Sequence, residues 1–98
     1  MRRVFGEVWQ RAERNTECCE PPPDEHRLEL QNHAGENWIG LLRVTDGASF
    51  RRGVRQLGTW TAATPSMLES LAVGETYLLR HGATPVAYIL VHGFEDEI

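Results

Sequence analysis

Two apolar segments near the C-terminus, separated by a short polar loop, constrain the fold of this chain more than any other feature. Residues 76–80 (TYLLR) and 85–92 (PVAYILVH) are rich in the aromatic and β-branched side chains that favour strands. The loop between them contains Gly82, which can adopt the positive φ of a tight turn. Pro85 has no amide hydrogen and is expected at the beginning of its strand. These residues predict an antiparallel β-hairpin.

Residues 64–74 have the start and stop signals of a helix. Thr64 is a suitable N-cap, and Pro65 fits the first helical position. Four apolar side chains recur with helical spacing on one face: Met67, Leu68, Leu71 and Ala72. Gly74 is placed to end the helix in a left-handed conformation. We therefore expect a helix here.

The first 25 residues are expected to precede the folded domain. An apolar stripe with three- and four-residue spacing predicts a helix over residues 2–17; it consists of Val4, Phe5, Val8, Trp9 and Ala12. The prolines at 21–23 cannot continue a helix and indicate a linker. Residues 1–25 are accordingly interpreted as an N-terminal helix followed by a proline-rich linker.

The middle of the chain contributes shorter elements. Residues 26–31 alternate between polar and apolar side chains and predict a short, half-buried strand. An apolar stretch beginning near Asn37 indicates a short helix, which Gly40 weakens. Residues 50–57 fit either the end of a helix or an extended piece. The expected fold class is therefore α+β, with a short strand, two to three helices and an antiparallel β-hairpin.

Composition restricts the partners of the chain. Its 98 residues allow one domain, and a formal net charge of −4 argues against a dedicated nucleic-acid binder. Residues 51–80 carry a net charge of +2, with Arg51, Arg52, Arg55 and Arg80 against Glu69 and Glu75. A mixed solvated surface is favoured over a small basic patch as the interpretation of these charges. No apolar stretch approaches the length of a membrane span, and the N-terminus lacks the apolar core of a signal peptide. We expect a cytoplasmic protein that does not bind membranes.

The usual signals of metal binding and catalysis are missing. Cys18 and Cys19 are adjacent and are interpreted as a reduced dithiol, because their spacing from His26 and His33 matches no common zinc pattern. There is no phosphate-binding loop, dinucleotide fingerprint or nucleophile elbow. The sequence assigns no catalytic residue and no metal ligand.

Other candidate residues receive structural interpretations. His81 is expected in a solvated turn, and His92, near Glu95 and Asp96, at an exposed strand end rather than as a base. Residues 94–98 are expected to form a solvated acidic tail rather than a paired-carboxylate site at Glu95, Asp96 and Glu97. Core packing is favoured over pocket lining for Trp60. Tyr77 and Tyr88 are expected to be strand residues whose hydroxyls reach water.

Residues 52–98 resemble the first half of a GCN5-related N-acetyltransferase. The resemblance is carried by residues 52–56 (RGVRQ) followed by Trp60, by residues 74–78 (GETYL), and by residues 85–90 (PVAYIL). It implies that residues 26–98 are a partial acetyltransferase-like domain whose helices and hairpin line the pocket of a small-molecule or peptide amine. The substrate-binding residues that it implies are Arg55, Gln56, Trp60 and Tyr77.

The coenzyme-binding part of that family has no counterpart in this chain. Its Arg/Gln-x-x-Gly-x-Gly/Ala loop, whose backbone amides hold the coenzyme pyrophosphate, is missing. The resemblance thus implies a truncated domain that is not catalytic alone, whether or not a complete protein is an enzyme. It implies no cofactor in these residues, and acetyl-coenzyme A if the missing half is supplied.

Two other functions fit the same region. The first is a DNA-binding antitoxin of the prevent-host-death type, which the chain resembles at residues 54–57 (VRQL), 74–75 (GE), 80–82 (RHG) and 85–87 (PVA). The second is a non-enzymatic interaction module. A half-domain ending on Val91 leaves a strand edge exposed, and such an edge predicts a homo-oligomer.

Overall fold

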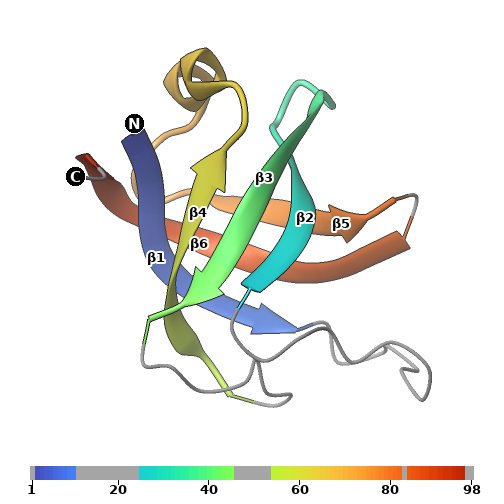
Figure 1. The fold of residues 1–98 in the computed structure, drawn as a ribbon, viewed down its shortest axis with the longest axis vertical. Coiled ribbons are helices and arrows are strands. Elements are labelled where there is room, and N and C mark those ends of the chain that lie inside the picture. The colour runs from blue at the N-terminus through green and yellow to red at the C-terminus, as the bar shows by residue number, and fades with distance from the viewer. Residues whose placement is uncertain (1, 11–24, 46–53, 83, 97–98) are drawn as a thin grey trace.

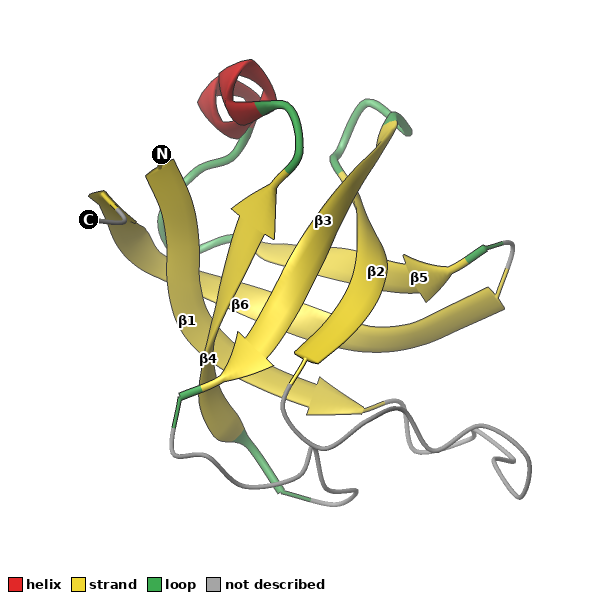
Figure 2. Cartoon of the chain, viewed as in Figure 1, coloured by secondary structure: helices red, strands yellow, loops and turns green. Residues whose placement is uncertain are grey.

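The fold consists almost entirely of β-strands. The computed structural model describes residues 2–10, 25–45, 54–82 and 84–96. Its elements, in chain order (Figures 1 and 2), are β1 (Arg2–Gln10), β2 (Glu25–Gln31), β3 (Asn37–Val44), β4 (Gln56–Ala62), the 3₁₀ helix η1 (Pro65–Ser70), β5 (Thr76–His81) and β6 (Thr84–Asp96). The expected α+β fold with two to three helices is therefore wrong.

The six strands close into an antiparallel barrel in the order β1-β4-β3-β2-β5-β6, with β6 returning to β1. The N- and C-terminal strands are thus neighbours (Figure 1). In their antiparallel register the backbone of Arg2 lies opposite that of Asp96. Val91, where a free edge was expected, pairs with Gly6 of β1, and its amide donates to the Glu75 carbonyl on the other side. Oligomerisation through a strand edge stays a prediction, but Val91 does not supply that edge.

Residues 2–10 form strand β1 instead of the expected helix. Val4 and Val8 point into the barrel and are fully buried, whereas Phe5 is 36% exposed on the outside. Residues four apart share a face in a strand as well as in a helix, so the apolar stripe fits both structures. Because β1 pairs with β4 and β6, it is part of the barrel. Residues 11–24, which include the expected linker and both cysteines, lie outside the described part of the chain.

Residues 37–44 likewise form a strand, β3, instead of a helix. Gly40, Leu42 and Val44 face the interior, and the residues between them are more exposed. Gly40 is required where it stands because the Trp60 ring packs directly against its α-carbon. An added β-carbon would overlap that ring and lie 2.6 Å from the Thr61 carbonyl oxygen.

The helix expected over residues 64–74 is reduced to the six-residue 3₁₀ helix η1. Thr64 stands at the N-cap position but makes no side-chain capping bond, and Leu71, not Gly74, follows the helix as its C-cap. Gly74 does have a positive φ of 87°. It lies in the turn before β5, where its amide donates to the Val91 carbonyl.

The predicted strand over residues 26–31 and the predicted hairpin are confirmed. They correspond to β2 and to β5–β6; Gly82 at the turn has a φ of 62°, and Pro85 is the second residue of β6. Residues 56 and 57 begin β4, so the extended interpretation holds there. The acidic tail expected over residues 94–98 is wrong for residues 94–96, because β6 continues to Asp96 and Glu95 Oε1 lies 2.6 Å from Arg3 Nε. Residues 97 and 98 lie outside the described part of the chain.

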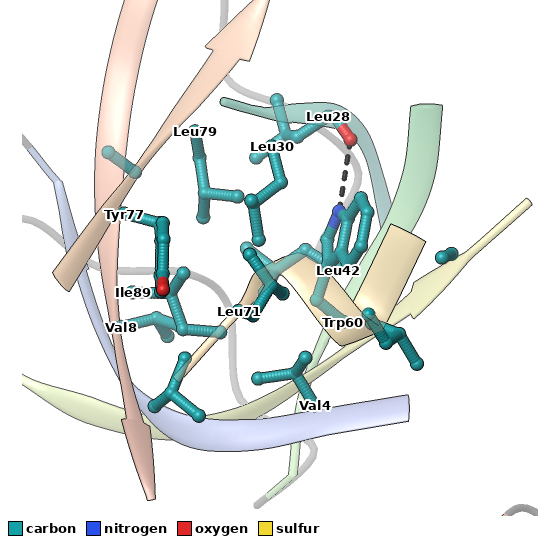
Figure 3. Close-up of a cluster of buried hydrophobic side chains, with 14 of the residues drawn as sticks. Val4, Val8, Leu28, Leu30, Leu42, Trp60, Leu71, Tyr77, Leu79 and Ile89 are labelled. Atoms are coloured by element: carbon teal, nitrogen blue, oxygen red, sulfur yellow. Dashed lines mark hydrogen bonds between the residues drawn. The ribbon is translucent and has the colours of Figure 1, made fainter. Parts of the chain in front are cut away.

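The barrel encloses one apolar core that contains Trp60, as expected (Figure 3). The Trp60 side chain is fully buried, and its indole N–H donates to the Leu28 carbonyl at 3.1 Å. The hydroxyl of Tyr77 does not reach water: the residue is 2% exposed, and its oxygen accepts from the Ala72 amide at 2.8 Å. Met67, Leu68 and Leu71 extend the core at the end of the barrel near η1. No helix in the described segments has the length and apolar character needed to cross a membrane.

Candidate binding surface

A line of side chains crosses the outside of the barrel at one level. In β1, Val8 points inward and the next residue, Trp9, points outward. Trp9 pairs with Tyr88 of β6, Tyr88 with Leu78 of β5, and Leu78 with Gln31 of β2. Arg55, the residue just before β4, completes the line by its contact with Trp9. We call these residues the outer row: Arg55, Trp9, Tyr88, Leu78 and Gln31.

The aromatic members of the outer row are stacked. The Trp9 and Tyr88 rings have centroids 5.7 Å apart and planes inclined by 30°. The guanidinium carbon of Arg55 lies 4.0 Å from the centre of the Trp9 ring, which is cation–π geometry. Arg55 is exposed, whereas Trp9 and Tyr88 are half-buried. Three side chains from segments far apart in the sequence therefore form one contiguous, amphipathic stack outside the core.

The outer row continues into a shallow depression at its β2 end. The depression has a volume of about 360 Å³ and is lined by Gln31, Asn32, His33, Thr76, Tyr77, Leu78 and Tyr88. His33 forms one wall, with its ring stacked on that of Tyr77 at a centroid distance of 4.5 Å and an angle of 25°. The His33 Nε2 atom is 3.2 Å from the Thr76 carbonyl oxygen, a hydrogen bond that requires a proton on Nε2.

Asn32 fixes the loop that carries His33. Its Oδ1 atom accepts from the amides of Ala34 and Glu36, and its Nδ2 atom donates to the Glu36 carboxylate and the Ser70 hydroxyl. Asn32 is only 5% exposed, so these bonds satisfy a buried amide and tie the β2–β3 loop to η1. The wall of the depression is therefore held by the fold.

A polar pair lies one level away from the outer row. His92 Nε2 is 3.0 Å from Glu7 Oε2, so its carboxylate partner is Glu7 rather than the expected neighbours Glu95 and Asp96. His92 is the extra residue of a bulge in β6, because Gly93 pairs with Phe5 while Val91 pairs with the next β1 residue. Both members of the pair are about one-third exposed. Among the described residues, no three His, Cys, Asp or Glu side chains gather as metal ligands do.

The four residues expected to bind substrate are dispersed. Trp60 and Tyr77 belong to the core, and Gln56 is 6% exposed at the start of β4. Arg55 lies outside, on Trp9. Tyr77 reaches the depression, which the other three do not line. Their role in substrate binding stays a prediction.

The pairing of Trp9 with Tyr88 was missed by sequence reasoning. Local spacing predicts Trp9 as part of a helical stripe and Tyr88 as a strand residue with its hydroxyl in water. The useful signal was the alternation Val4, Phe5, Gly6, Glu7, Val8, Trp9, which is compatible with a strand and places Trp9 on the polar face. Its neighbour in β6, however, depends on long-range pairing that local patterns do not contain.

No family model matches the chain, and neither a curated protein nor a solved structure matches it. The resemblance to N-acetyltransferases therefore stays a prediction that no relative tests. The α+β fold that it implied is replaced by the closed barrel.

Proposed function

We propose that this chain is a non-enzymatic binding module that takes an extended polypeptide segment across the outer row. The observation that carries the proposal is the stack of Arg55 on Trp9 on Tyr88 outside the barrel core. Trp, Tyr and Arg are the residues most enriched where single side chains dominate binding energy. The cytoplasmic location expected from the sequence is part of this proposal.

The dimensions of the outer row suit a short extended segment. The row crosses neighbouring strands, which lie about 4.8 Å apart, so its five members span roughly 19 Å. An extended polypeptide covers about 3.3 Å per residue, and about six residues fill this length. The depression beside Leu78 and Tyr88 offers space for one side chain at the end of such a segment.

Charge favours a polypeptide over single-stranded nucleic acid. Aromatic platforms bind single strands when a positively charged groove accompanies the backbone. Arg55 is the only cation of the outer row, and the adjacent level carries the Glu7 carboxylate. The net charge of the chain is −4, which further opposes a polyanion.

A selection from a random displayed-peptide library tests the proposal. We expect the wild-type protein to enrich peptides that the Trp9→Ala and Tyr88→Ala variants fail to retain. Ile39→Ala is the matched control, because Ile39 is 55% exposed on β3, a strand that contributes no residue to the outer row and does not pair with β1 or β6, and its removal should not change peptide binding. Amide spectra establish that each variant is folded. Failure to enrich any peptide, or enrichment that survives both outer-row variants, contradicts the proposal.

A further inference from the structure

Trp9 and Tyr88, outside the barrel, differ from Trp60 and Tyr77, in its core, in the hydrogen bonding of their N–H and O–H groups. Inside the barrel, the Trp60 indole donates to Leu28 and the Tyr77 hydroxyl accepts from Ala72. Within the described structure, Trp9 and Tyr88 interact through their rings, and neither the Trp9 N–H nor the Tyr88 O–H has a hydrogen-bond partner. The outer row therefore presents the exposed parts of its aromatic rings, together with unpartnered N–H and O–H donors, to an incoming ligand.

The closed barrel restricts how a polypeptide can use those groups. At Tyr88 and Leu78, β6 pairs with β1 and β5, and β5 pairs with β6 and β2, so no backbone edge is open there for strand addition. The β1–β4 ladder ends at Val8 and Gln56, one residue before Trp9. A helix about 10 Å wide needs a broad apolar groove, whereas the polar pair Glu7–His92 lies one level from the row. A ligand at this surface must be recognised through its side chains and its own free carbonyls.

A polyproline II segment can be recognised both through its side chains and through its free carbonyls. This conformation has no internal hydrogen bonds, so its carbonyls are available to the Trp9 and Tyr88 donors. Its proline rings are rigid and apolar, and they pack against aromatic-lined surfaces at a low entropic cost. Little ordering entropy is lost because the segment is already extended before it binds.

Arg55 favours a ligand that carries a negative charge at one of its ends. The guanidinium carbon of Arg55 lies over the Trp9 ring, and the side chain is exposed, so its N–H groups can also reach a ligand. No carboxylate among the described residues pairs with Arg55. A ligand carboxylate next to the prolines can therefore accept charge-assisted hydrogen bonds from it.

We infer that the ligand of the outer row is a proline-rich segment in the polyproline II conformation, with an acidic residue at the Arg55 end. The inference rests on the proposed binding function and names its ligand class. The prolines pack on Trp9 and Tyr88, and these two residues donate hydrogen bonds to the segment's carbonyls.

Titration of the ¹⁵N-labelled protein with defined peptides tests the inference. The probes are two acetylated, amidated peptides of six prolines: one carries an aspartate at its N-terminal end, and the other carries it at its C-terminal end. Both are needed because a polyproline II segment can dock in two directions. We expect saturable shifts at Trp9, including its indole N–H, and at Tyr88. Replacing the prolines by alanines should weaken binding about tenfold or more. Replacing aspartate by asparagine should weaken it severalfold, and Arg55→Gln should remove that difference.

Conservative variants separate hydrogen bonding from ring contact. Tyr88→Phe and Trp9→Phe keep an aromatic face but lose the donor, and each should weaken the proline peptides about threefold. Tyr88→Ala should weaken them about tenfold or more. Ile39→Ala is again the control and should bind normally.

The outcomes distinguish the inference from the proposed function. If the alanine peptides bind as well as the proline peptides, or if octathymidylate shifts the outer row while the proline peptides do not, the inference is overturned. If selected peptides need Trp9 and Tyr88 but contain no prolines, the binding function stands and its proline-rich ligand is refuted. If neither defined nor selected peptides bind, both are refuted.

Discussion

Trp60 and Trp9 lie on opposite sides of the barrel wall. Trp60 is enclosed, with its N–H bonded to Leu28 and its ring against the bare α-carbon of Gly40. Trp9 lies outside, between Arg55 and Tyr88. The placement of each ring depends on its immediate neighbours: a glycine that leaves room inside, and a cation and a phenol that flank the ring outside.

The Gly40–Trp60 contact leads to a stability prediction. We expect Gly40→Ala to lower the free energy of unfolding by about 1–3 kcal/mol, because the new methyl group overlaps a buried ring and approaches the Thr61 carbonyl. Urea unfolding monitored by tryptophan fluorescence measures the change. Gly93→Ala is the matched control: its β-carbon meets the Phe5 ring at 2.9 Å, but Phe5 is 36% exposed and can move aside. Equal costs for the two variants would show that the Trp60 contact is unimportant.

At the scale of single elements, β1 illustrates why helices were expected where strands formed. Val4 and Val8, four residues apart, fall on one face in either structure. The alternation that separates the two possibilities is obscured because Gly6, the inward residue between them, has no apolar side chain. The hairpin lacked this ambiguity, because its β-branched residues and the glycine at its turn favour the same local structure.

The position of β1 in the barrel predicts that Val8 is essential. Val8→Asp should destabilise the protein by about 3 kcal/mol or more, since an unpaired carboxylate would replace a fully buried side chain. Val73→Asp makes the same chemical change at a residue that is 61% exposed and should stay within about 0.5 kcal/mol of wild type. Thermal unfolding followed by circular dichroism compares the two. A tolerated Val8→Asp substitution would mean that residues 2–10 are an appendage to the domain.

At the scale of the whole molecule, closure joins strands from both ends of the chain. β1 pairs with β6 along its whole length, from Arg2 to Gln10. The β2–β5 ladder is much shorter and joins only Glu29, Leu30 and Gln31 of β2 to β5. The barrel therefore has one extensive seam between its terminal strands and one short seam near the depression.

The difference in length between the β1–β6 and β2–β5 ladders should be visible in amide hydrogen exchange. We expect amides in the β1–β6 ladder to exchange only through global unfolding, and amides in the β2–β5 ladder to exchange faster through local opening. Native-state exchange measured by NMR at increasing denaturant concentrations separates the two classes. Uniform protection around the barrel would contradict a weak seam between β2 and β5.

Local patterns in the sequence were sufficient for the hairpin, for strand β2 and for the burial of Trp60. In each of these the controlling interactions are short-range or follow from residue type: turn geometry, β-branching, alternation and the size of an indole ring. The tertiary structure decided that residues 2–10 and 37–44 are strands, that the terminal strands pair, and that Arg55, Trp9 and Tyr88 meet on one face. Backbone hydrogen bonds between strands distant in sequence fix these features, because a segment with an ambiguous period adopts the structure that its partners can pair with and bury.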